Sequence, residues 1–81
     1  MKTFEEFYES RKTYEIDVGD FKSQLVYSLI SDAERAGIMA RGPYNNNRYI
    51  KLSGEPAKVL KFIQDNYEKD VDAEELARWE D

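Results

Sequence analysis

Side chains able to bind a charged partner are concentrated in residues 21–53. This stretch has five basic and two acidic side chains, a net charge of +3, whereas residues 1–20 carry −3 and residues 54–81 carry −5. Its polar donors, cations and tyrosines suit contacts with base edges and phosphates. The candidate binding residues are Lys22, Gln24, Tyr27, Ser28, Arg35, Arg41, Tyr44, Asn45, Asn46, Asn47, Arg48 and Lys51. The alternative interpretation is an ordinary polar surface with no nucleic-acid role.

The residue types argue against catalysis. The chain has no His and no Cys, so the commonest general base, the thiol nucleophile and the ligands of soft metals are missing. The 17 carboxylates are expected mainly on solvated helix faces, and those from Asp65 to Asp72 lack the ligand spacing of a calcium loop. We therefore predict a protein that is not an enzyme and has no metal site and no cofactor.

The length of 81 residues suits one small domain, which must fold without disulfides. We expect this domain to span residues 1–81, with its core in residues 3–68 and a short C-terminal helix at residues 72–80. No apolar run approaches the roughly 20 residues that cross a bilayer, and no signal-peptide layout opens the chain. The sequence therefore predicts a cytoplasmic protein that does not contact membranes.

The basic stretch is predicted to form a helix followed by a β-hairpin. Apolar side chains recur at helical spacing over residues 21–36, with Asp20 as the expected N-cap and Gly37 as the expected C-cap. Residues 38–41 and 48–52 resemble short strands, and turn-forming Gly, Pro and Asn residues dominate the segment between them. The candidate binding residues therefore fall on one helix and one hairpin.

In the second strand of this hairpin, successive side chains are expected to point to opposite faces. Ile50 and Leu52 are expected to face the core, so Tyr49 and Lys51 point the other way. Tyr44 at the hairpin tip is hard to bury in its own fold, and an exposed aromatic is a typical interface anchor. The hairpin is therefore the first place to expect a partner.

Helices are also predicted on both sides of this stretch. Thr3 and Glu6 form a capping box at the start of an N-terminal helix. Pro56 suits the first turn of a helix that continues to about residue 67. Asp72 caps the helix at residues 72–80, and the C-terminal acids are expected to be a solvated tail.

Residues 13–18, TYEIDV, decide between two fold classes, because their alternation fits a strand while the same residues could form a short helix before Gly19. If they are helical, the fold is mainly α with a two-stranded β-hairpin wing. If they form a strand, the fold is α+β, a truncated ferredoxin-like βαββα arrangement with flanking helices and a sheet covered on one face.

Residues 25–53 resemble the recognition helix and wing of winged helix-turn-helix proteins of the MarR type. The positions that carry this resemblance are Val26, Leu29, Ile30, Glu34, Gly37, Ile38, Arg41, Arg48, Ile50 and Leu52. The resemblance implies the mainly α fold, which we adopt as the expectation. It also implies a regulatory protein that contacts nucleic acid through the helix at residues 21–36 and the hairpin at residues 38–52.

A second, shorter resemblance lies at the N-terminus, where MKTFEEF is similar to the opening of small accessory proteins of T-even-type tailed phages. It implies a phage protein acting in the host cytoplasm. The overall charge of −5 then offers an alternative function, an inhibitor that binds a host enzyme or defence protein as a nucleic-acid mimic.

A third interpretation is a homodimer formed through Phe4, Phe7 and Tyr8.

Overall fold

The computed structural model describes residues 12–81. The elements follow the order β1 (Lys12–Asp17), α2 (Ser23–Arg35), β2 (Met39–Tyr44), β3 (Tyr49–Gly54), α3 (Pro56–Asn66) and α4 (Ala73–Arg78). The N-terminal helix expected from Thr3, with Phe4, Phe7 and Tyr8, lies outside the described residues. Over residues 12–81, no helix is long and apolar enough to cross a membrane.

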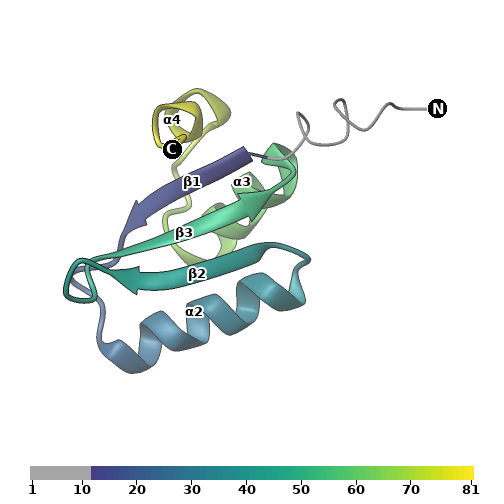
Figure 1. Cartoon of the computed structure of the whole chain (residues 1–81). Helices are drawn as coiled ribbons and strands as arrows, with labels where there is room; N and C mark the ends of the chain where they lie inside the picture. The colour runs from purple at the N-terminus through teal and green to yellow at the C-terminus, as the bar shows by residue number, and fades with distance from the viewer. Residues whose placement is uncertain (1–11) are drawn as a thin grey trace.

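The three strands form an antiparallel sheet in the order β1-β3-β2. Tyr14 and Ile16 of β1 lie opposite Leu52 and Ile50 of β3, and Ala40 of β2 lies on the other side of Leu52. All five side chains are buried, so one face of the sheet is apolar along its length. Figure 1 shows α3 passing behind the sheet and α2 running along the β2 side.

The two longer helices bury their apolar sides against this face of the sheet. Residues Val26, Leu29 and Ala33 of α2 and Val59, Phe62 and Ile63 of α3 belong to the same buried cluster as the strand residues. Their spacing of three and four residues places each set on one side of its helix. The opposite face of the sheet is uncovered by α2 and α3.

The expected fold class, mainly α with a two-stranded wing, is therefore wrong. TYEIDV is a strand, because pairing with β3 buries Tyr14 and Ile16, which are each 2% exposed. This strand removes the helix that a helix-turn-helix needs before its recognition helix. The structure is an α+β fold, and its order β1-α2-β2-β3-α3 is that of the α+β alternative.

The ends of α2 were only half predicted. Asp20 does not cap it: the N-cap position is held by Lys22, which makes no side-chain capping bond. Gly37 does end the helix, with a φ of +83°, which suits a residue without a Cβ. The helix thus begins later than the expected residue 21.

The starts of α3 and α4 agree with the sequence. Pro56 stands in the first turn of α3, where its missing N–H costs nothing. Asp72 caps α4, because its Oδ1 accepts the backbone N–H of Glu75 at 2.8 Å. The helix ends at Arg78, two residues before the expected boundary.

Residues 79–81 do not form the expected solvated tail. The Glu15 N–H donates to the Trp79 carbonyl at 3.0 Å, and the Asp81 N–H donates to the Thr13 carbonyl at 2.8 Å. Glu80 lies opposite Tyr14 in an antiparallel bridge between these bonds. The C-terminal residues therefore occupy the edge of β1 that is left free by β3, and partly satisfy its backbone groups.

Candidate functional site: the open face of the sheet

A bulge in β2 determines which side chains reach the open face. Arg41 pairs with Lys51 and Tyr44 pairs with Tyr49, so two residues of β2 lie opposite Ile50 alone. Without the extra residue, strict alternation would turn Tyr44 toward the core side. The bulge instead places Tyr44 on the open face directly across from Tyr49.

The bulge is possible because residue 42 is a glycine. Gly42 has a φ of +123°, a conformation that side chains with a Cβ rarely adopt. A Cβ at this position would also lie 3.1 Å from the Tyr49 carbonyl oxygen and 3.3 Å from the Ile50 Cα. The close approach of β2 and β3 at this point therefore depends on the missing side chain.

The turn between β2 and β3 uses three consecutive asparagines with positive φ. Asn45, Asn46 and Asn47 have φ values of 52°, 58° and 67°, and Asn tolerates this left-handed region better than most residues. The Arg48 N–H closes the turn by donating to the Tyr44 carbonyl at 2.9 Å. After the turn, Arg48 lies next to the end of β1. The Arg48 carbonyl accepts a hydrogen bond from the Val18 N–H at 2.7 Å.

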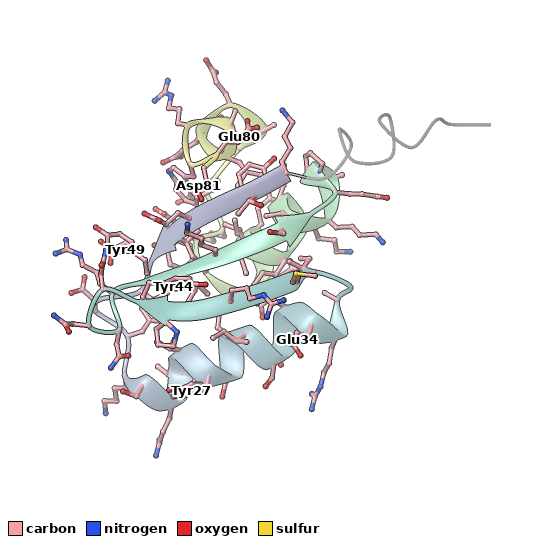
Figure 2. The ribbon with its side chains drawn as sticks, viewed as in Figure 1. Tyr27, Glu34, Tyr44, Tyr49, Glu80 and Asp81 are labelled. Carbon is pink, nitrogen blue, oxygen red and sulfur yellow. The ribbon has the colours of Figure 1, made fainter. Side chains whose placement is uncertain are left out.

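We define the open-face patch as Arg41, Tyr44, Arg48, Tyr49 and Lys51. The Lys51 Nζ lies 5.6 Å from the centroid of the Tyr44 ring, and the Arg48 Cζ lies 5.6 Å from the centroid of the Tyr49 ring. The Tyr44 side chain is 44% exposed although it belongs to a strand. Figure 2 shows both tyrosines at the hairpin end of the sheet. At these distances each cation is close enough to its ring for a cation–π contact.

The β1 side of the same face is acidic. Asp17 Oδ2 lies 3.5 Å from Arg48 Nε, and Asp81 Oδ2 lies 2.9 Å from Lys51 Nζ. The hydrogen bond to Asp81, followed by its negative charge, raises the pKa of Lys51 above its ordinary value. The open face thus has a basic, tyrosine-bearing side on β2 and β3 and an acidic side along β1.

Arg41 differs from the other two cations of the patch. Within residues 12–81 it has no carboxylate within ion-pair distance, and its guanidinium instead contacts the Met39 sulfur at 3.7 Å. Met39 is itself 46% exposed beside it. The β2 side of the patch therefore offers a cation whose charge is not already balanced by a neighbouring acid.

The structure separates the sequence-predicted binding residues into two groups. Arg41, Tyr44, Arg48 and Lys51 lie at the open face, and Asn45, Asn46 and Asn47 form the adjoining turn. The second group lies exposed on or beside α2, and this helix packs against the opposite face of the sheet. The group comprises Lys22, Gln24, Tyr27, Ser28 and Arg35. Within residues 12–81 the two groups therefore do not form the single partner surface that a recognition helix and its wing would provide.

Sequence reasoning left Tyr49 out of the candidate residues. Its outward direction was predicted, but its partner across the strands was not, because the bulge changes the pairing of β2 with β3. The signal was the Gly42-Pro43 pair within a strand, since both residues are typical of bulges and strand irregularities.

Two hollows flank the sheet. A polar one of about 450 Å³ adjoins the patch and is lined by Asp17, Gly19, Asp20, Asn45, Asn46 and Arg48. An apolar one of about 380 Å³ lies between β1, α3 and α4, and its lining includes Tyr14, Leu60 and Leu76. Neither holds a group of three or more acidic side chains that could bind a metal ion, and no such group occurs elsewhere in residues 12–81.

The open-face patch can therefore stack flat rings and contact anions. Its tyrosines provide the rings, and Arg41, Arg48 and Lys51 provide the charge. Comparisons of the chain with family models, curated proteins and solved structures found no match.

Proposed function

We propose that this protein binds single-stranded nucleic acid through the open-face patch. The observation that supports the proposal is the pair of tyrosines, Tyr44 and Tyr49. They lie directly opposite each other on the sheet face that no helix of residues 12–81 covers, with a cation beside each ring. Unpaired bases stack on such rings whatever their sequence, at about 1–3 kcal/mol per base. The neighbouring cations are placed to contact the phosphates that flank the stacked bases.

An unpaired strand fits this surface better than a duplex. Bases in a duplex are already stacked on each other and do not offer their faces to protein side chains. Duplex recognition through the major groove needs a protruding helix or ribbon, but α2 packs along the sheet on its other face. An extended strand can instead lie across a flat sheet, with successive bases meeting Tyr44 and Tyr49.

The charges of the open face set the expected strength of binding. Three cations lie on the patch, and the acidic side along β1 repels phosphates and directs the strand toward β2 and β3. For single strands each neutralised phosphate contributes about −0.7 to the slope of log K against log salt concentration. Three contacts give a slope near −2, so we expect weak binding that is readily lost at high salt.

Binding of a basic host protein by the acidic surface finds less support in this geometry. Interface anchors are typically aromatic, and the exposed Tyr44 and the half-buried Tyr49 both lie on the basic side of the face. The acidic side along β1 has no comparable anchor among its outward residues, Thr13, Glu15 and Asp17.

The proposal is tested with fluorescein-labelled 12-nucleotide DNA and RNA strands of mixed sequence, titrated with protein at low salt and followed by fluorescence anisotropy. We expect saturable binding that weakens about 5- to 150-fold in Tyr44→Ala and in Tyr49→Ala, as loss of one stacked base implies. Tyr27→Ala is the matched control, because Tyr27 is also a tyrosine and is 59% exposed, but it lies on α2. Binding that is absent in the wild type, or that falls equally in the Tyr27 variant, would contradict the proposal.

A further inference from the structure

We propose that Asp81 is an internal competitor for the nucleic-acid backbone, occupying Lys51 in the free protein and yielding it to a phosphate when a strand binds. This inference rests on the proposed function and adds a mechanism that limits the affinity of the same surface.

Asp81 lies along the edge of β1 that does not pair with β3. Its backbone N–H donates to the Thr13 carbonyl at 2.8 Å, which fixes the residue against β1. The side chain of Lys51 on the central strand β3 and the carboxylate of Asp81 meet across β1, where Asp81 Oδ2 lies 2.9 Å from Lys51 Nζ. This is the shortest ion pair within residues 12–81, and it lies on the open face beside the Tyr44 ring.

A carboxylate and a phosphate make the same kind of contact with an ammonium group. Both offer anionic oxygens that accept a charge-assisted hydrogen bond of about 2.7–2.9 Å. The hydrogen bond of 2.9 Å from Lys51 Nζ to Asp81 Oδ2 stabilises the charged lysine, which is the main reason why the pKa of Lys51 is raised. A phosphate that approaches Lys51 therefore gains only the difference between the two contacts.

The neighbouring residue provides a contrast that isolates this effect. Glu80 is adjacent in sequence, carries the same charge and also pairs with a lysine, Lys12, at 3.3 Å. Because neighbouring residues of an extended segment point to opposite faces, Glu80 instead lines the apolar hollow on the helix side. Removing the charge of Glu80 changes the net charge of the protein by the same amount as removing the charge of Asp81. It does not change any contact of the open-face patch.

The experiment compares Asp81→Asn and Glu80→Gln in the full-length protein, using the labelled strands described above. Asparagine keeps the backbone hydrogen bond to Thr13 and removes only the charge. Because exposed ion pairs are weak, we expect Asp81→Asn to tighten binding by about 1.5- to 5-fold, with little change in Glu80→Gln.

A second pair of variants, Lys51→Met with and without Asp81→Asn, tests whether the effect passes through Lys51. We expect the gain from Asp81→Asn to disappear when Lys51 is methionine. Equal affinities of Asp81→Asn and Glu80→Gln would overturn the inference, as would a gain that persists without Lys51. In either case the wild type still binds, so the proposed function survives; a wild type that binds no strand at low salt rejects both.

The ion pair itself has a readout that needs no nucleic acid. Reductive methylation with ¹³C-formaldehyde labels each lysine, and NMR then follows its titration. We expect the pKa of Lys51 to be lower in Asp81→Asn than in the wild type and unchanged in Glu80→Gln. An unchanged Lys51 titration in Asp81→Asn would show that the contact does not persist in solution, which also overturns the inference.

Discussion

Gly42→Ala is the substitution that most directly tests how β2 is built. The backbone at Gly42 has a φ of +123°, which costs a residue with a Cβ about 1–3 kcal/mol. The new methyl group would also lie 3.1 Å from the Tyr49 carbonyl oxygen, so the edge strand β2 must move away from β3. We expect a loss of about 2–4 kcal/mol in the free energy of unfolding, out of about 4–12 kcal/mol for a domain of 81 residues.

Urea unfolding followed by circular dichroism at 222 nm measures this loss, and thermal unfolding should show a midpoint lowered by at least about 10 °C. Gly54→Ala is the matched control, because its Cβ would meet Ile38 and Val59 at 3.7 Å, an ordinary van der Waals distance. We expect that variant to differ from the wild type by less than about 1 kcal/mol. A Gly42→Ala protein as stable as Gly54→Ala would refute the reasoning about the bulge.

Three further predictions concern single contacts and are checked by the same unfolding measurements. Asp72→Ala removes the cap on α4 and should cost about 1 kcal/mol, whereas a cost near zero would mean that the bond to Glu75 contributes nothing. Asn46→Ala places a less tolerant residue at a φ of 58° and should cost about 1 kcal/mol, while Asn46→Gly should be close to neutral; the reverse order would contradict the left-handed turn. Tyr67→Phe removes the hydrogen bond that the hydroxyl donates to the Asp17 carbonyl at 2.6 Å and should cost about 0.5–1.5 kcal/mol at neutral pH. Burial and the Asp17 carboxylate raise the pKa of Tyr67, so its contribution is full below pH of about 10 and is lost at higher pH; the variant should lose less stability there than the wild type, and parallel curves would contradict this.

The sequence predicted α2, α3, α4 and the hairpin well because their signals are local. Apolar spacing, Pro56, Asp72 and Gly37 all act within a few residues of the element they start or end. The fold class was wrong because it depended on TYEIDV, whose local pattern suits two structures. These residues form a strand because they pair with β3, which lies about 40 residues further along the chain. A local sequence pattern contains no information about such a distant pairing.

The sequence named four of the five residues that form the open-face patch, but it did not predict how they are arranged. The basic stretch contains Arg41, Tyr44 and Arg48, and the hairpin brings these three residues to one face. The expectation that α2 would share this surface failed with the fold class, because α2 packs on the other side of the sheet. The contact of Asp81 with Lys51 joins residues 30 positions apart and depends on how residues 79–81 lie along β1. The acidic composition of these residues instead suggested a solvated tail.

The most direct test of the central claim is an NMR titration of the ¹⁵N-labelled protein with an unlabelled single strand at low salt. The open-face patch predicts that amide shifts concentrate in β2, β3 and the asparagine turn, strongest near Tyr44 and Tyr49, while the amides of α2 stay in place. Shifts concentrated on α2 between Lys22 and Arg35, or no shifts at millimolar strand, would contradict the claim that the sheet face binds nucleic acid.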